Sequence, residues 1–229
     1  MTLRHWHFTF KKLNMLRRYR KIEPNEFIVV GVDTAAGGLD YCAAQFLSKT
    51  RLDVPIVYHS KSLATEMTPI VFGELERIYD VTGVPPTVAY ERNNGGVFEL
   101  ERLASLNRLN KFRIFNMMTY GAIDNPDKRK IGWDTNSATR PLMLSGLKEA
   151  VDKRLLKLYD KRTVDEMFSF IVVETSTAWK AQAEKGAHDD LVMSLAIAWQ
   201  LQQSERVPPL DEDEEFPDDT KKIDDDGFY

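Results

Sequence analysis

Runs of apolar residues alternate along the chain with segments in which apolar residues recur every three or four positions. The run Phe27–Asp33 is apolar up to its last residue and predicts a buried strand. Two further runs, 41–47 and 56–60, predict strands that extend it into an antiparallel meander. Helical spacing follows at 67–81, where Ile70 lies on the apolar face. The first third of the chain therefore predicts three strands and a helix.

The remaining chain continues this alternation. Apolar segments at 87–90 and 112–115 predict a fourth and a fifth strand, with a helix over 97–106 between them. A helix is predicted over 139–158, with its inner face formed by Leu142, Leu144, Leu147, Val151 and Leu155. A short strand at 168–173 and a helix over 189–203 complete the order. This order predicts an α/β domain in which α-helices flank a mixed central β-sheet.

Charge is unevenly distributed, so the net charge of −4 over 229 residues is misleading. Residues 1–22 hold seven Lys or Arg and no acid, whereas 205–229 hold eleven acids against three bases. We predict a basic lead-in or linker at 1–25, a folded domain at 26–204 and an acidic tail at 205–229, disordered when alone. With the tail set aside, −4 + 8 leaves a charge of +4, so the charge has to be interpreted by segment.

Composition indicates the cellular compartment in which the protein works. Cys42 is the single cysteine, which excludes an intrachain disulfide and a cysteine-based zinc site. The apolar runs are too short to span a membrane, and no apolar segment of signal-peptide type follows the basic start. We therefore expect a cytoplasmic protein with no membrane association.

Four carboxylates stand at the ends of predicted elements. Asp33 closes the first strand, Glu91 closes the fourth, and Asp189 and Asp190 open the last helix. If the first and fourth strands are neighbours, Asp33 and Glu91 project from one sheet edge, and the last helix can pack across that edge. Such a cluster of like charges is costly unless cations occupy it, and oxygen ligands suit Mg²⁺ or Mn²⁺.

Each of these acids also has a structural interpretation. An aspartate at a strand end is often a turn former, and one that opens a helix is often an N-cap worth about 1 kcal/mol. His188 is by the same reasoning a surface or capping residue. The combination favours a catalytic role, because two adjacent acids that open an almost wholly apolar helix, Leu191–Trp199, require a partner cation. Two ions about 3.5–4 Å apart could then clamp a phosphodiester for in-line displacement.

Four stretches, in this order, resemble the nuclease domain of phage terminase large subunits. They are Val30–Gly38, Val88–Asn94, Ile131–Arg140 and Gly186–Ala196, and the last is the most specific. The resemblance spans about 170 residues, from Phe27 to Trp199. It implies an RNase H-like fold of the resolvase branch, with a β-hairpin or loop insertion beside the active site.

The resemblance also implies a function, namely two-metal cleavage of double-stranded DNA during viral genome packaging, when concatemers are cut. In that case Asp33, Glu91 and one or both of Asp189 and Asp190 are the catalytic residues and hold two Mg²⁺ or Mn²⁺ ions, with Asp33 as the bridge. The sequence leaves open which member of the pair is the principal ligand, because neighbouring helical residues point about 100° apart.

A basic and polar segment, 117–140, resembles the hairpin and loop that adjoin the active site in that family. It supplies candidate DNA-binding residues, whose bases and amides suit phosphate contacts: Lys128, Arg129, Lys130, Trp133, Asn136 and Arg140. The structural alternative is an exposed turn with solvated charges.

The chain departs from the family in one respect, since it holds no Gly-x-x-x-x-Gly-Lys-Ser/Thr phosphate loop. We therefore expect an excised C-terminal half, whose partners are the ATPase domain of the same polypeptide, the portal protein and the small terminase subunit. The expected location is the cytoplasm of the infected bacterial host. In the tail, Phe216, Phe228 and Tyr229 are candidate anchors on a partner.

Three alternatives remain at this stage. A Holliday-junction resolvase or a transposase-like nuclease would use a similar carboxylate set on a different DNA substrate. A sugar-kinase or actin-like ATP-binding fold shares the core topology but needs a second phosphate-binding turn and a second domain. A non-catalytic module that docks on DNA or a portal would use the acids only structurally, so metal-dependent nicking of a plasmid separates it from the nucleases.

Overall fold

The computed structural model describes residues 15–35, 40–118, 130–174, 179–183 and 188–206, with the backbone alone within 171–183. A mixed seven-stranded sheet forms its centre, with six strands in the order β1-β4-β3-β2-β5-β6 and with β9 also paired to β4. The strands are β1 (Leu16–Arg18), β2 (Ile28–Asp33), β3 (Cys42–Ser48), β4 (Asp53–Ser60), β5 (Thr87–Tyr90), β6 (Arg113–Ile114) and β9 (Lys157–Leu158). Strands β1 to β4 pair antiparallel, whereas β5 runs parallel to β2 and β6 parallel to β5.

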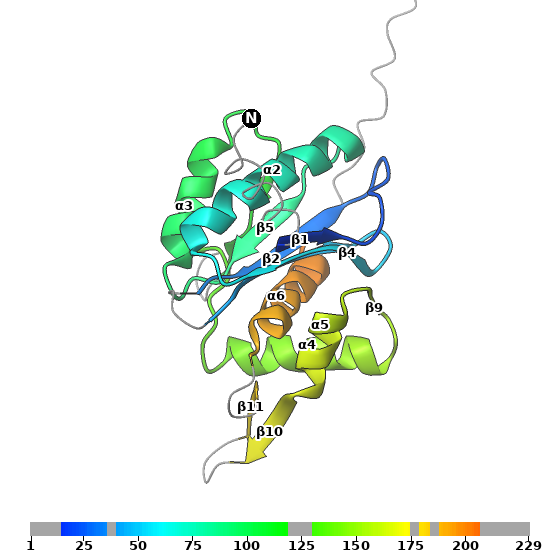
Figure 1. Cartoon of the computed structure of the whole chain (residues 1–229), viewed down its shortest axis with the longest axis vertical. Helices are drawn as coiled ribbons and strands as arrows, with labels where there is room; N and C mark the ends of the chain where they lie inside the picture. The colour runs from blue at the N-terminus through cyan, green and yellow to red at the C-terminus, as the bar shows by residue number, and fades with distance from the viewer. Residues whose placement is uncertain (1–14, 36–39, 119–129, 175–178, 184–187, 207–229) are drawn as a thin grey trace, which may run out of the picture.

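Helices cover both faces of this sheet (Figure 1). The helices α2 (Ala64–Thr82) and α3 (Gly96–Leu106) lie on one face, and α4 (Thr139–Asp152), α5 (Lys161–Phe168) and α6 (Asp190–Ser204) lie on the other. Successive side chains of a strand point to opposite faces. Accordingly Val29 joins the core under α6, whereas Val30 and Val32 join the core under α2. The two-sided apolar run of β2 is therefore the sequence pattern of a central strand.

Gly31 of β2 lets α6 approach the sheet closely. A Cβ atom at this position would lie 2.1 Å from the carbonyl oxygen of Ser194 and 2.4 Å from the amide nitrogen of Ala198. Both atoms belong to the backbone of α6, so no side-chain movement could relieve the contact. The helix thus rests directly on β2, and its first turn reaches the end of the strand where Asp33 lies.

The third quarter of the chain differs from the prediction. The helix predicted over 139–158 ends at Asp152, and its buried face is formed by Met143, Leu144, Leu147 and Ala150. Leu142 and Leu155 are 68% and 47% exposed, so the predicted inner face was wrong except at Leu144 and Leu147. The helix ends early because residues 157–158 pair with β4, which the helical spacing could not reveal.

Residues 161–174 hold two further differences. The helix α5 was not predicted, since its short sequence is rich in charged residues. The strand predicted at 168–173 exists as β10 (Phe170–Glu174), but it pairs with β11 (Trp179–Ala183) in a separate hairpin that projects away from the central sheet (Figure 1).

The predicted lead-in contributes to the sheet. Leu16 is buried and β1 pairs antiparallel with β4, while Arg18 pairs with Glu74 of α2. Arg20 binds the carboxylates of Glu26 and Asp53. Residues 1–14 and 207–229, with the predicted anchors Phe216, Phe228 and Tyr229, lie outside the described residues. No described helix is long and apolar enough to cross a membrane.

A small hairpin borders the sheet edge at the carboxyl end of β5. Its strands β7 (Asn116–Met117) and β8 (Lys130–Ile131) pair antiparallel. Beyond β8, Trp133 forms a bridge with Glu91, and its amide donates to the carbonyl of Tyr90 at 2.9 Å. The predicted hairpin insertion is therefore present next to Glu91.

Candidate active site

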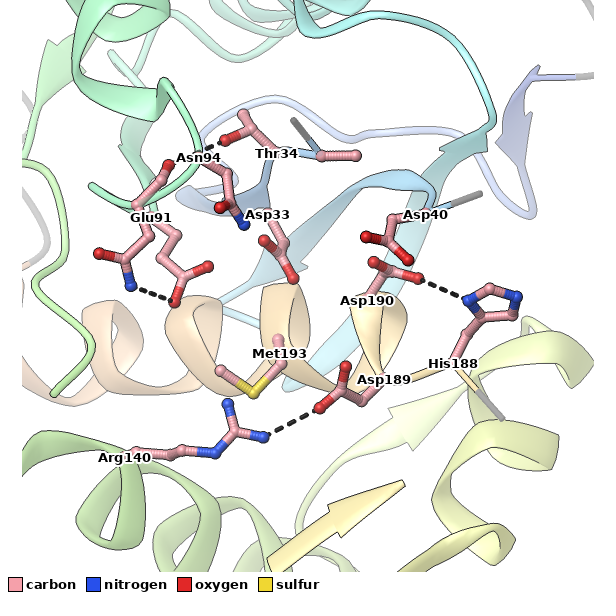
Figure 2. Close-up of a pocket in the computed structure, with 12 residues that line it drawn as sticks. Asp33, Thr34, Asp40, Glu91, Asn94, Arg140, His188, Asp189, Asp190 and Met193 are labelled. Atoms are coloured by element: carbon pink, nitrogen blue, oxygen red, sulfur yellow. Dashed lines mark hydrogen bonds and ion pairs between the residues drawn. The ribbon is translucent and has the colours of Figure 1, made fainter. Parts of the chain in front are cut away.

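A cavity of about 600 Å³ opens at the carboxyl ends of β2 and β5, beside the start of α6 (Figure 2). Its lining includes five carboxylates but only one guanidinium and one imidazole, and the residues that carry these groups are Asp33, Asp40, Glu91, Asp189, Asp190, Arg140 and His188. The four acids predicted from sequence thus face one space. Their positions follow from the parallel pairing of β2 with β5 and the packing of α6 on β2.

Asp33 is the last residue of β2 and only 8% exposed. Burial raises the pKa of Asp33 well above its usual value, and the charge of the adjacent Glu91 raises it further. The charges of Asp190 and Asp189 act in the same direction. A buried carboxylate surrounded by carboxylates is costly to ionise, so the arrangement favours either a proton or a cation at this position.

Glu91 is held by backbone bonds on both sides. Its amide donates to the carbonyl of Val32 at 2.7 Å, and the next amide, of Arg92, donates to the carbonyl of Trp133. The side-chain amide of Asn93 donates to Oε1 of Glu91 at 3.3 Å. At Gly96 a Cβ atom would lie 1.8 Å from the carbonyl oxygen of Glu91, so only glycine fits there. The backbone at Glu91 is therefore held in place, and the amide of Asn93 orients its carboxylate.

The start of α6 distinguishes the two adjacent aspartates. Asp189 precedes the helix without a side-chain capping bond, and its Oδ2 accepts from Nη2 of Arg140 at 2.9 Å (Figure 2). Asp190 is 9% exposed, and its Oδ2 is buried without a hydrogen-bond partner among the described residues. Burial raises the pKa of Asp190 to about 6, and the charge of Asp189 contributes to this increase. Asp189 thus occupies the N-cap position, but its side chain does not cap the helix.

The capping group of α6 comes instead from α5. Oε2 of Glu166 accepts from the amides of Leu191 and Val192 at 2.9 and 3.2 Å. Burial raises the pKa of Glu166 to about 7, against the lowering effect of these two bonds. Its second oxygen, Oε1, lies 3.9 Å from Nε2 of His59, the penultimate residue of β4. Burial lowers the pKa of His59 to about 4, so this imidazole is neutral at pH 7.

Three residues were not predicted from the sequence, namely His59, Glu166 and Asp40, of which Asp40 lines the cavity. His59 stands near a strand end, like Asp33, and this position was the available signal. Glu166 carries no such signal, because it lies among charged residues in a helix that the pattern did not predict.

The predicted DNA-binding residues have different environments. Arg140 lines the cavity, whereas Trp133 is only 8% exposed and packs in the core against Phe115. Its assignment to the DNA surface is therefore corrected, because its backbone bonds to Tyr90 at the end of β5 hold it in the core. The Oδ1 atom of Asn136 accepts from the amides at 138 and 139 and so caps α4. Lys130 is exposed and pairs with Asp134. Lys128 and Arg129 lie outside the described residues.

No protein-family model matches the chain. Its structure is similar to that of the large terminase nuclease from the thermophilic phage G20c with bound magnesium, with a TM-score of 0.58 and 16% identity over 81% of this chain and 87% of that one. The nuclease domain of the Thermus phage P74-26 large terminase gives 0.58 and 15%, over 85% and 90%. A manganese-soaked terminase nuclease domain from human cytomegalovirus gives 0.52 and 10%, over 84% and 92%.

The chain has the terminase nuclease fold. The predicted RNase H-like α/β architecture is therefore confirmed, although identities of 10–16% carry the likeness no further than the fold. Within that fold, the cavity lies where β2, β5 and α6 converge, and its chemistry rests on this chain's own residues.

Proposed function

We propose that the chain is a metal-dependent endonuclease that cleaves double-stranded DNA in viral genome packaging. The observation that carries this proposal is the convergence of Asp33, Glu91, Asp189 and Asp190 on one cavity. Carboxylate oxygens suit Mg²⁺ and Mn²⁺, and the buried Oδ2 of Asp190, which lacks a hydrogen-bond partner among the described residues, fits a ligand atom. Two similar folds were solved with magnesium bound or after a manganese soak, which supports this choice of ions.

Each residue has a distinct role in this proposal. Asp33, between Glu91 and the start of α6, would hold both ions, and Glu91 and Asp190 would complete the ligand set. Bound ions would supply positive charge to the phosphodiester transition state and would lower the pKa of the attacking water. Asp189 holds Arg140 at the cavity, where the guanidinium is placed to contact a phosphate. This division makes Asp190 the principal ligand of the pair.

DNA would approach from the side of the hairpin. Lys130 lies in the hairpin and Arg140 in the first turn of α4. Lys128 and Arg129 directly precede Lys130 in the sequence. These four bases would bind phosphates without reading the sequence, so neutralising all four should weaken binding to unrelated duplexes equally. The slope of log K against log salt should become shallower by roughly 0.9 for each phosphate that the variant no longer binds. An unchanged slope would place the DNA on another surface.

Cleavage of supercoiled plasmid tests the activity. The native chain should nick plasmid in Mn²⁺ or Mg²⁺ and lose this activity in excess chelator. Asp33→Asn, Glu91→Gln and Asp190→Asn should each lose most of the activity while keeping the native circular-dichroism spectrum. The matched control is Asp165→Asn, which removes an exposed carboxylate from α5 and should cut normally. Equal cutting by Asp33→Asn, or cutting that survives in chelator, would refute the proposal.

The choice of DNA substrate separates the related functions. A packaging nuclease should cut long linear duplex and plasmid with little sequence preference. Strong preference for a four-way junction over matched linear duplex would instead assign a resolvase. Metal-dependent DNA binding without any cleavage would assign a docking module. Pull-down with a portal protein, a small terminase subunit and a terminase ATPase domain tests the proposed partners.

A further inference from the structure

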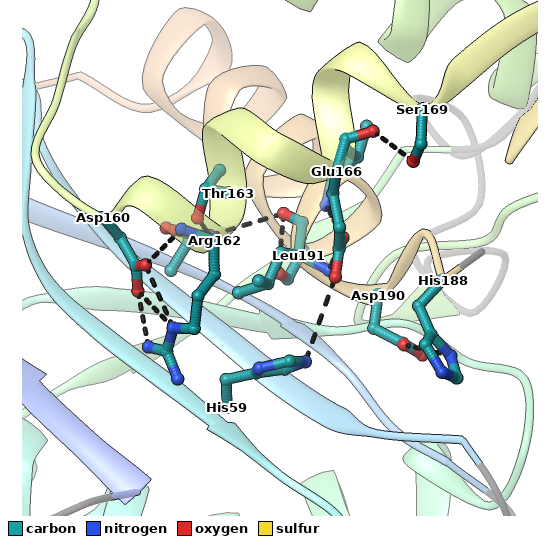
Figure 3. A network of polar contacts seen from close by, with 12 residues as sticks. His59, Asp160, Arg162, Thr163, Glu166, Ser169, His188, Asp190 and Leu191 are labelled. Carbon is teal, nitrogen blue, oxygen red and sulfur yellow. Dashed lines mark hydrogen bonds and ion pairs between the residues drawn. The ribbon is translucent and has the colours of Figure 1, made fainter.

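A second group of potential ligands shares Asp190 with the carboxylate cavity. His59, Glu166 and Asp190 each offer one ligand atom, and these atoms all lie within 4.8 Å of one another (Figure 3). They come from β4, α5 and the first turn of α6, so three separate elements converge. Neither His59 nor Glu166 lines the cavity itself.

The polar atoms of this group lack adequate partners. Nε2 of His59 and Oδ2 of Asp190 are buried without a hydrogen bond among the described residues. In the described part of the chain, the ion pairs of Glu166 and Asp190 involve histidines alone, His59 at 3.9 Å and His188 at 3.6 Å. Two carboxylates and an imidazole thus face one another, and neither carboxylate pairs with a Lys or Arg in the described part of the chain. Unsatisfied buried groups of this kind are costly unless something binds them.

The surrounding residues hold the three side chains in place. Glu166 is anchored through Oε2 by the amides of Leu191 and Val192, which leaves Oε1 directed toward His59. The ring of His59 stacks on Tyr41, with centroids 4.3 Å apart and planes inclined by 22°. The nearby guanidinium of Arg162 is bound by Asp160. Such supporting contacts are typical of the residues around a metal ligand.

We propose that His59, Glu166 and Asp190 form a divalent transition-metal site, separate from the carboxylate cavity, that takes Zn²⁺ or Mn²⁺ in preference to Mg²⁺. One imidazole nitrogen with two carboxylate oxygens suits these ions, whereas Mg²⁺ prefers oxygen ligands and retains its water. With bonds of about 2.1 Å, ligand atoms lie at most about 4.2 Å apart. The observed spacing of up to 4.8 Å therefore closes with small side-chain rotations. Occupancy fixes the orientation of Asp190, which the two groups share.

Nitrogen NMR of the histidine side chains gives a direct test that does not depend on nuclease activity. The chain has four histidines, so long-range ¹H–¹⁵N spectra of chelator-treated, ¹⁵N-histidine-labelled protein are simple to assign. One equivalent of Zn²⁺ should shift the Nε2 resonance of one imidazole, and His59→Gln should abolish that shift. The same addition of Mg²⁺ should leave it unchanged.

Three variants separate the possible positions of the ion. His188→Gln is the matched control and should retain the Zn²⁺-dependent shift. The double variant Asp33→Asn with Glu91→Gln should also retain it, so a failure of the proposed nuclease activity leaves this test intact. Glu166→Gln keeps an oxygen for the amides of α6 but removes the charge, and should weaken Zn²⁺ binding roughly 10–100-fold.

Three results would overturn the proposal. If no imidazole shifts with Zn²⁺, or if the shift survives in His59→Gln and is lost in His188→Gln, the proposal is overturned. Loss of the shift in the double variant would assign the ion to the carboxylate cavity and would also overturn it. Circular dichroism of each variant distinguishes a lost ligand from a lost fold.

Discussion

Replacing Asp190 by asparagine should stabilise the metal-free protein. In the folded chain, burial and the charge of Asp189 raise the pKa of Asp190 from its usual 3.8 to about 6. At about 1.4 kcal/mol for each pH unit, this difference corresponds to about 3 kcal/mol of destabilisation when the carboxylate is ionised. Solvent in the open cavity screens part of it, so we expect a gain of about 1–2 kcal/mol. For a chain of this size, the melting temperature should rise by roughly 2–8 °C.

The pH dependence has a definite sign. Because the folded-state pKa is raised, the folded protein holds its proton more tightly than the unfolded chain between about pH 4 and pH 6. The native protein therefore loses stability as the pH rises through this window, and Asp190→Asn lacks that loss. The difference between the two proteins should be small at pH 4 and reach its full size above pH 7.

Thermal unfolding in excess chelator, from pH 4 to pH 8, measures this effect. The control is Asp165→Asn, in which the lost carboxylate is 56% exposed and the change should stay within about 0.5 kcal/mol. Saturating Mn²⁺ should reverse the order, because the native protein gains more from binding. A variant that is no more stable than the native chain at pH 8, or a gain equal at pH 4 and pH 8, would refute the electrostatic argument.

Three further predictions concern packing, DNA contact and the acidic tail. Gly31→Ala should destabilise the protein by about 3 kcal/mol in urea unfolding, because its Cβ meets the backbone of α6, whereas Gly73→Ala, with nothing within 4 Å, should stabilise by about 0.5–1 kcal/mol. Equal effects would contradict the close packing of α6 on β2. Arg140→Gln should weaken binding to unrelated duplexes and make the salt dependence shallower by roughly the slope of one phosphate, measured by fluorescence anisotropy. An unchanged slope would limit Arg140 to pairing with Asp189. Deleting residues 207–229 removes a sequence with ten acids and two bases, so DNA binding should tighten, most at low salt; equal affinity at low salt would show that the tail does not screen the domain.

The spacing of apolar residues along the chain was sufficient to predict the elements that pack against apolar neighbours. The two-sided apolar run of β2 and the almost wholly apolar α6 can only be central, so both their existence and their burial could be predicted. Acids at the ends of such elements are equally visible, which is why Asp33, Glu91, Asp189 and Asp190 could be chosen before the fold was known.

Only the tertiary structure decided which of these groups meet and what each one contacts. Trp133 looked like a DNA contact from its basic neighbours, but its bridge to Glu91, directly after β5, places it in the core. Asp189 and Asp190 are equivalent in sequence, yet one faces Arg140 and the other faces His59 and Glu166. His59 and Glu166 lie 131 and 24 residues from Asp190 along the chain. A periodic pattern indicates which face of one segment is buried. Contacts between distant segments depend instead on strand pairing and helix packing. Those contacts determine the charges around each carboxylate, on which the chemistry depends.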